Sequence, residues 1–286
     1  MVKIGLVQFV ADFDKKINME KILHYTRESI ANGAQIICHQ ELATTYYFGI
    51  DQDLSHFKEA EVIPGYSTEL VGEIAKEFGV VIILPLYEKV IEGEYYNTAA
   101  VIGTDGKVMG KYRKTHIPEA IAVDEGSGIR KFYSEKFYFR PGNLGFPVFE
   151  TPFGAKFGII ICYDRHFPEA SRMIALGGAD ILFVPTSTAG VMCNLWEVEL
   201  RFLALSNVFY VGGVNRVGRD TGLCTPRKHL GSSMIVDPRG ELVTQAGNES
   251  DQIIYAEVDL DLIRDLRNHC GYYRDRRPEI YTKLCQ

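Results

Sequence analysis

Long apolar runs and an excess of basic residues are both missing from this 286-residue sequence. No stretch reaches the roughly 18–20 apolar residues that a membrane-spanning helix requires. The net charge is −6, so the sequence does not predict the basic surface that binds nucleic acid. The N-terminal apolar stretch 2–10 is short and lacks a small-residue cleavage site, so we expect a strand there rather than a signal peptide. The sequence therefore predicts a protein that binds neither a membrane nor a nucleic acid.

Cysteines and histidines at metal-binding spacings are missing as well. The six cysteines include no CxxC pair, and the seven histidines show no HxxxH or HExxH spacing. Because zinc sites usually carry such spacings, we expect no metal and no other cofactor. Without an export signal, the expected state of the cysteines is free thiols in a reducing cytoplasm. The cysteines are Cys38, Cys162, Cys193, Cys224, Cys270 and Cys285.

The composition that is present is that of an ordinary globular protein, with 46% hydrophobic and 24% charged residues. Apolar, β-branched runs predict strands over residues 2–10, 34–41, 80–90, 179–187, 208–218 and 253–260. Turn and periodicity signals predict hairpins over 97–114, 148–164 and 231–245, and helices over 17–32, 68–78, 168–176 and 195–207. Residues 115–146 follow neither pattern, and we expect a long functional loop there.

The order of these elements predicts the fold class. It mixes β-α-β crossovers with hairpins, which favours an α/β fold with mixed sheets and helices on their outer faces. No linker or low-complexity tract interrupts the sequence, so we expect a single domain over residues 1–286. The alternative is a pair of βαβ-rich halves joined near residue 145.

Three of the predicted strands end in a residue that can take part in catalysis: Glu41, Lys114 and Cys162. Sites in α/β sheets form at the carboxyl ends of strands, so these side chains are expected to converge. A thiolate can attack a carbonyl, a carboxylate can move its proton, and an ammonium can offset the oxyanion. We also expect the helix that begins near Pro168 to favour the thiolate. Taken singly, Cys162 is more typical of core packing, and Glu41 and Lys114 are more typical of ordinary surface charges.

The motif set is similar to that of the nitrilase, or carbon–nitrogen hydrolase, superfamily. The resemblance covers nearly the whole chain. It rests on KIGLVQF, Glu41, GKYRKTHIP, GIIICYDRHFPEA, ADILFVPTS, VGGVNRVG and GSSMIVDPRGE, in that order. It implies a four-layer α-β-β-α sandwich that packs across a helical face into αββα–αββα homodimers or larger homo-oligomers. It further implies that the C-terminal tail, about residues 262–286, lies at a subunit interface.

The resemblance also implies roles for individual residues. Glu41 would be the general base, Lys114 the oxyanion stabiliser and Cys162 the nucleophile. A second active-site glutamate of the family falls on Glu135 in the segment SEKFYFRPGNLGFPVF, and Glu119 is the competing candidate. His116 in KTHIP would either contact the substrate or brace Lys114.

Within the superfamily, the sequence resembles the branch that hydrolyses N-carbamoyl amino acids and amines. YDRHFPE places Arg165 where D-carbamoylases hold a substrate carboxylate, and RH, with His166, is seen among β-ureidopropionases. The expected substrate is N-carbamoyl-β-alanine or an N-carbamoyl-D-amino acid, and Arg165 argues against a cationic one because like charges repel in a pocket with little water. The alternatives are a nitrilase, an aliphatic or ω-amidase, an N-carbamoylputrescine amidase, or a scaffold without turnover. Arg165 could instead form a structural ion pair with Asp164 or Glu169.

Overall fold

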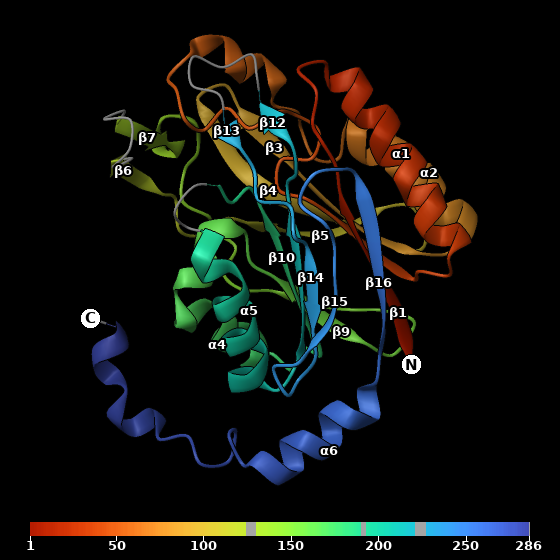
Figure 1. Ribbon diagram of the computed structural model, residues 1–286, viewed down its shortest axis with the longest axis vertical. Helices are drawn as coiled ribbons and strands as arrows, with labels where there is room; N and C mark the ends of the chain where they lie inside the picture. The colour runs from red at the N-terminus through yellow and green to blue at the C-terminus, as the bar shows by residue number, and fades with distance from the viewer. Residues whose placement is uncertain (124–129, 190–192, 221–226, 286) are drawn as a thin grey trace.

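The computed structural model describes residues 1–123, 130–189, 193–220 and 227–285. Two six-stranded sheets pack face to face, with one pair of helices on each outer side (Figure 1). The layers therefore follow the order α-β-β-α, and the predicted α/β fold with mixed sheets is confirmed.

The first sheet has the strand order β16-β1-β2-β3-β4-β5. Its strands are β1 (Val2–Gln8), β2 (Ile36–His39), β3 (Val81–Ile91), β4 (Glu94–Ile102), β5 (Val108–Arg113) and β16 (Gln252–Val258). Strands β1, β2 and β3 are parallel, whereas the outer pairings are antiparallel. Helices α1 (Lys15–Ala31) and α2 (Tyr66–Phe78) connect the parallel strands and cover the outer face.

The second sheet has the order β15-β14-β11-β10-β9-β8 and the same plan, with three parallel strands in the middle. Its strands are β8 (Val148–Glu150), β9 (Lys156–Ile159), β10 (Ile181–Thr186), β11 (Tyr210–Asn215), β14 (Met234–Val236) and β15 (Leu242–Gln245). Helices α4 (Pro168–Leu176) and α5 (Cys193–Asn207) cover its outer face on the side away from α1 and α2 (Figure 1).

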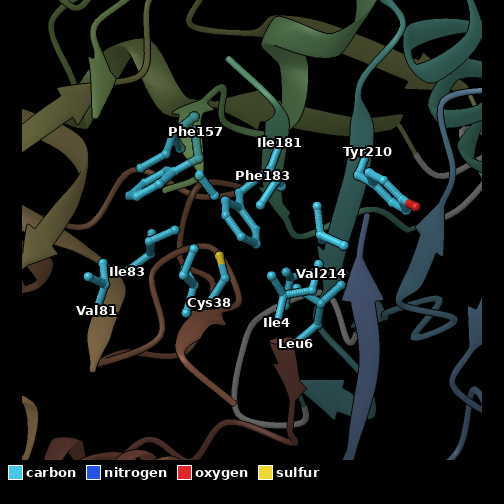
Figure 2. Packing of buried hydrophobic residues seen from close by; sticks show 14 of the residues in the cluster. Ile4, Leu6, Cys38, Val81, Ile83, Phe157, Ile181, Phe183, Tyr210 and Val214 are labelled. Carbon is cyan, nitrogen blue, oxygen red and sulfur yellow. The ribbon is translucent and has the colours of Figure 1, made fainter. Parts of the chain in front are cut away.

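The largest apolar cluster lies between the two sheets. Figure 2 shows Ile4 and Cys38 of the first sheet facing Phe183 and Val214 of the second. All four side chains are fully buried. Burial of this kind contributes about 25 cal/mol per Å² of apolar surface, so the inter-sheet layer holds the strand ends of both sheets in fixed positions.

The region 115–146, predicted as a loop, contains regular structure. It holds a two-stranded hairpin and one helical turn: β6 (Glu119–Val123), β7 (Arg130–Ser134) and α3 (Glu135–Tyr138). The expectation was wrong because β6 and β7, within the described ranges, pair with each other outside the two large sheets, so their sequence lacks the pattern of a core strand. Short elements elsewhere are η1 (Leu54–Glu59), η2 (Cys162–His166), β12 (Arg219–Asp220) and β13 (Arg227–Lys228).

The chain returns to the first sheet before it ends. Strand β16 pairs with β1 from Val2 opposite Val258 to Gln8 opposite Gln252. Helix α6 (Leu260–Cys270) and the turns η4 (Pro278–Ile280) and η5 (Thr282–Cys285) then form an arm that extends from the body (Figure 1). Within the described ranges, no helix is long and apolar enough to cross a membrane.

Candidate active site

The ammonium of Lys114 lies between two buried carboxylates. Lys114 directly follows β5, and its Nζ is 2.9 Å from Oε1 of Glu41 and 2.7 Å from Oε2 of Glu135. All three residues are completely shielded from solvent. Two carboxylates thus share one ammonium in a site shielded from solvent, and the structure brings together Glu41 and Lys114, which were expected to converge.

The two oxygens of Glu41 have different surroundings. Oε1 accepts hydrogen bonds from Lys114 Nζ and, at 2.8 Å, from Nδ2 of Asn97. Oε2 is buried and has no hydrogen-bond partner among the described residues. The first oxygen therefore anchors the carboxylate, and the second is available to accept a proton.

Glu135 is the first residue of α3, and the segment that follows β2 holds its side chain in place. Its Oε1 accepts a hydrogen bond of 2.6 Å from the hydroxyl of Tyr47. Gly49 lies directly against it, because a Cβ at that position would be 2.8 Å from Cγ of Glu135. The competing candidate Glu119 is mostly exposed, and its carboxylate pairs with Lys136 at 3.4 Å instead of approaching Lys114. The geometry therefore favours Glu135 as the second glutamate of the site.

Burial and charge together set the protonation states of this cluster. Burial opposes the charge on Lys114, yet the adjacent Glu135 and Glu41 raise its pKa well above the usual value, so it stays an ammonium. Burial would raise the pKa of Glu41, but the charge and hydrogen bond of Lys114, with the hydrogen bond of Asn97 and the nearby Ser187 hydroxyl, hold it below its usual value. Burial, with repulsion from Glu41, raises the pKa of Glu135.

Cys162 begins the turn η2 in a left-handed backbone conformation, with φ of +50°. The buried carboxylate of Asp164 fastens this turn. It accepts hydrogen bonds from the backbone N–H of Ile161 at 3.0 Å, from the hydroxyl of Tyr112 at 2.7 Å, and from the backbone N–H of His116 at 2.8 Å. Since β-branched and other L residues rarely adopt such a φ, these bonds stabilise a strained turn that presents the thiol.

The thiol of Cys162 is not a resting thiolate, contrary to the expectation from the nearby helix. Burial and the anion of Glu41 raise its pKa to about 11, although Lys114 and Arg165 act in the opposite direction. The thiol is therefore protonated near neutral pH and needs a base before it can attack.

Arg165 and His166 share one carboxylate, that of Glu199 on α5. Arg165 Nε donates to Glu199 Oε2 at 2.7 Å, and Nδ1 of His166 is hydrogen-bonded to Oε1. Nη1 of Arg165 also donates to the backbone carbonyl of Cys162 at 3.0 Å and lies 3.9 Å from its Sγ. Arg165 is thus next to the thiol, but its charge is paired with Glu199 rather than with Asp164 or Glu169, the two partners considered from the sequence.

His116 lies beside the turn that carries Cys162. Its Nδ1 is 2.7 Å from Oδ1 of Asp164, and its ring stacks on Phe167 with 3.8 Å between the centroids. Two roles were considered for His116, substrate contact and support of Lys114. The contacts show that His116 supports the turn that carries Cys162 rather than Lys114.

Sequence patterns did not single out several residues that hold this site. They are Tyr47, Asn97, Asp164, Ser187, Glu199 and Arg216. Asp164, Ser187 and Arg216 lie within the motifs GIIICYDRHFPEA, ADILFVPTS and VGGVNRVG, but the motifs alone gave them no role. The six residues come from different segments, so no spacing along the chain reveals that they meet.

Within the described ranges, no group of three or more His, Cys, Asp and Glu side chains is arranged to hold a metal ion. The family model described as carbon–nitrogen hydrolase matches residues 3–268. The chain belongs to this family. As a family member it is a hydrolase that acts on non-peptide carbon–nitrogen bonds, and the predicted membership of the nitrilase superfamily is confirmed.

Two curated relatives and one solved structure illustrate the similarity. The N-carbamoylputrescine amidase of Arabidopsis thaliana is 37% identical over 298 residues, covering 99% of this chain and 95% of the relative. The β-ureidopropionase of the same organism is 33% identical over 267 residues, covering 88% of this chain and 63% of the relative. A carbon–nitrogen hydrolase from Helicobacter pylori G27 superposes with a TM-score of 0.89 at 30% identity, covering 100% of this chain and 98% of that chain.

Proposed function

We propose that this carbon–nitrogen hydrolase cleaves N-carbamoyl compounds with Cys162 as its nucleophile. The observation that carries the proposal is the single ammonium of Lys114 held between Glu41 and Glu135, beside a thiol whose electrostatic neighbours are these same groups. In this arrangement Glu41 is the general base and acid, Lys114 offsets the oxyanion, and Glu135 holds Lys114 in place.

The proposed first half of the reaction begins with a protonated thiol. Because the pKa of Cys162 is raised to about 11, Glu41 takes the thiol proton through its unpaired Oε2 as sulfur bonds to the ureido carbon. The negative charge that develops on the carbonyl oxygen lies near the ammonium of Lys114. Glu41 then returns the proton to the departing nitrogen, and ammonia leaves while a thioester-like carbamoyl group stays on sulfur.

The second half hydrolyses this covalent intermediate. Glu41 removes a proton from water, the resulting hydroxide attacks the same carbon, and the carbon–sulfur bond breaks. The proton returns to the sulfur of Cys162, which restores the resting thiol. The released carbamic acid decomposes into carbon dioxide and an amine, so one water is consumed for each ammonia released.

Among N-carbamoyl compounds, we favour one with an amine at its far end. The structural support is the pairing of Arg165 with Glu199, because a compensated guanidinium repels a cationic substrate less than a lone one would. The similarity to a relative named N-carbamoylputrescine amidase, which extends over 99% of this chain, supports the same choice. The main expectation from the sequence, an N-carbamoyl amino acid, thereby becomes the second candidate.

The second candidate retains one specific observation in its favour. Nη1 of Arg165 lies 3.9 Å from Sγ of Cys162, within reach of a substrate that bonds to that sulfur. An arginine fork binds carboxylates well, as an N-carbamoyl-β-alanine site requires. The similarity to a β-ureidopropionase points the same way.

Ammonia release from three substrates of similar length tests the choice. We expect N-carbamoylputrescine to be hydrolysed with higher kcat/KM than N-carbamoyl-γ-aminobutyrate, which replaces the amine by a carboxylate, and than the neutral N-butylurea. A preference for the carboxylate would select the second candidate. Turnover of only a simple amide or a nitrile would overturn the N-carbamoyl proposal altogether.

The role of Cys162 is tested in the same assay with a matched pair of variants. Cys162→Ala should abolish ammonia release, whereas Cys270→Ala, which changes an exposed free cysteine on α6, should leave it unchanged. Full activity of Cys162→Ala would contradict the mechanism.

We further propose that a second copy of the chain covers the outer face of α4 and α5. Six large apolar side chains are exposed there: Met173, Leu176, Leu195, Val198, Phe202 and Leu205. The four on α5 recur at intervals of three and four residues, which places them in one stripe. Exposed apolar side chains gathered in this way are typical of interfaces between subunits.

The arm after α6 lies at the same end of the molecule. It is tied to its own chain by Tyr273, whose hydroxyl donates to the carbonyl of Asn207 at 2.6 Å, while Ile280 and Leu284 stay exposed. We expect analytical ultracentrifugation to show a dimer or larger oligomer that Phe202→Glu dissociates. Leu54→Glu, at an exposed leucine on η1, should leave the assembly intact.

A further inference from the structure

Arg216 links the second sheet to the segment that carries Glu41. It directly follows β11, and its side chain is completely buried. Its Nη2 donates to three backbone carbonyls of the first half of the molecule: Glu41 at 2.9 Å, Leu42 at 2.9 Å and Thr45 at 3.0 Å. The guanidinium of Arg216 therefore binds three carbonyls of a tight turn that follows β2 of the first sheet.

The turn that Arg216 binds has a backbone that needs support. Leu42 has a φ of +49°, a left-handed conformation that costs free energy for a residue with a branched side chain. Within the turn, the N–H of Thr45 donates to the carbonyl of Leu42 at 3.1 Å. Because the carbonyls of Glu41, Leu42 and Thr45 point toward one spot, a cation with several donors stabilises this conformation.

The same segment positions both acids of the site. Its first residue is Glu41, which contacts Lys114, and its seventh is Tyr47, which donates to Glu135. The guanidinium is also linked to Glu41 through Ser187. Nε of Arg216 donates to Ser187 Oγ at 3.4 Å, and the nearby Ser187 hydroxyl contributes to the lowered pKa of Glu41.

We propose that Arg216 is a positioning residue of the hydrolase, which fixes the segment 41–47 so that Glu41 and Glu135 both face Lys114. The proposal rests on the role of Glu41 given above as general base. Arg216 acts from the opposite sheet and through the backbone, so its contribution depends on the two sheets being docked. It also explains why a guanidinium, with donors in a planar fork, stands at this position rather than a lysine.

The direction of the effect follows from the contacts of Glu41. If the turn relaxes, the carboxylate of Glu41 moves away from Lys114 and Asn97, which are the groups that lower its pKa. Burial then dominates and the pKa of Glu41 rises. A base with a higher pKa is protonated over a wider range at low pH, so the acid limb of the kcat profile moves to higher pH.

The test compares Arg216→Lys with Arg267→Lys. Arg267 on α6 also donates to the backbone carbonyls of two strand-flanking residues, Val208 and Ala179, but it lies away from the site. Both variants are expected to unfold at a lower temperature. Only Arg216→Lys should lower kcat, by about tenfold or more as expected for a misplaced catalytic group, and move the acid limb upward, with KM nearly unchanged.

Activity is expressed per folded protein, with the folded fraction taken from the thermal unfolding curve of each variant, so that an unfolded fraction does not count as lost catalysis. If Arg216→Lys does not fold, Ser187→Ala acts on the same guanidinium from its other side and should move the acid limb in the same direction by less. A normal kcat and acid limb in whichever of these variants folds would overturn the proposal.

Glu41→Gln separates this inference from the proposed mechanism. An active Glu41→Gln variant would mean that the assignment of the base is wrong, and the inference would fall with it. An inactive Glu41→Gln together with a fully active Arg216→Lys would leave the mechanism standing and remove only the role of Arg216.

Discussion

Two buried ion clusters start from neighbouring residues at the end of β5 and have opposite compositions. Arg113 belongs to a cluster with Glu88 and Lys111, in which one carboxylate meets two cations. Lys114 belongs to the other, in which one cation meets Glu41 and Glu135. Successive side chains of a strand point to opposite faces, so one strand end supplies both clusters.

The clusters differ in whether every oxygen is satisfied. In the first, Glu88 Oε1 accepts from Lys111 and Arg113, and Oε2 accepts from Thr98 at 2.7 Å and from Arg113 at 2.8 Å. In the second, Oε2 of Glu41 has no partner among the described residues. In the first cluster, two cations face one carboxylate, and every oxygen of Glu88 is hydrogen-bonded. In the second cluster, two carboxylates share one cation, and one buried oxygen of Glu41 stays available to accept a proton.

The largest effect is expected from removing the single cation of the second cluster. Lys114→Met leaves two carboxylates facing each other and no charge for the oxyanion. We expect kcat to fall by roughly 10³-fold and the free energy of unfolding to fall by about 3–5 kcal/mol. Ammonia release and urea denaturation measure the two quantities. Lys111→Met leaves the ion pair of Arg113 with Glu88 in place, so kcat should stay normal. A decrease in kcat equal to that of Lys114→Met would show that the two clusters do not differ in function.

A smaller effect is expected from neutralising the base without changing its shape. Glu41→Gln preserves the volume but removes the oxygen that accepts the proton, so kcat should fall by roughly 10²-fold or more. Thermal unfolding should show a protein that still folds. A variant that keeps wild-type kcat across the pH range would rule out Glu41 as the base.

Glu88→Gln should show the reverse pattern, with normal kcat and lower stability. It leaves Arg113 buried without its anion, which we expect to cost about 1–3 kcal/mol. Arg113 and the other donors hold the pKa of Glu88 below its usual value, so its contribution is present above the unfolded-state pKa and is lost as pH falls through the folded-state pKa. Urea denaturation of the wild type and of Glu88→Gln at several pH values should therefore show that the difference between their free energies of unfolding becomes smaller in acid. A constant difference would contradict this account.

The smallest effect is expected from Gly49→Ala. The added methyl group would meet Cγ of Glu135 at 2.8 Å and the hydroxyl oxygen of Tyr47 at 3.0 Å, so Glu135 must shift. We expect a decrease in kcat of about tenfold or less, with little change in stability. Gly93→Ala is the control, because a Cβ there would have no atom within 4 Å, and it should keep kcat even if its positive φ lowers stability. Equal kcat in Gly49→Ala and the wild type would show that Glu135 tolerates displacement.

The strands of the two sheets followed from apolar runs, because burial on both faces leaves a continuous signal in the sequence. The helices that connect them followed from turn and periodicity signals. Glu41, Lys114 and Cys162 could be placed near one another for a related reason, since each follows a strand. Glu135 came from the family resemblance alone. The helical turn that carries it was missed with β6 and β7, which have no core pattern.

The partners of these residues could not be predicted because they depend on three-dimensional contacts between distant segments. Glu199 neutralises Arg165 from 34 positions away, and that pairing changed the expected substrate charge. Arg216 binds the carbonyl of Glu41 across 175 positions. Neither contact leaves a periodic signal, and the raised pKa of Cys162 depends on burial that only the assembled site provides.

The pairing of β16 with β1 has a consequence for how the protein is made. A growing chain exposes the edge of β1 from the start, but its partner emerges only when residues 252–258 leave the ribosome. Until then, the unpaired edge can join other chains, which is a hazard for a protein with so many long-range contacts. Strand β16 thus covers the exposed edge of β1 at the end of synthesis. A chain shortened before β16 should therefore aggregate more readily.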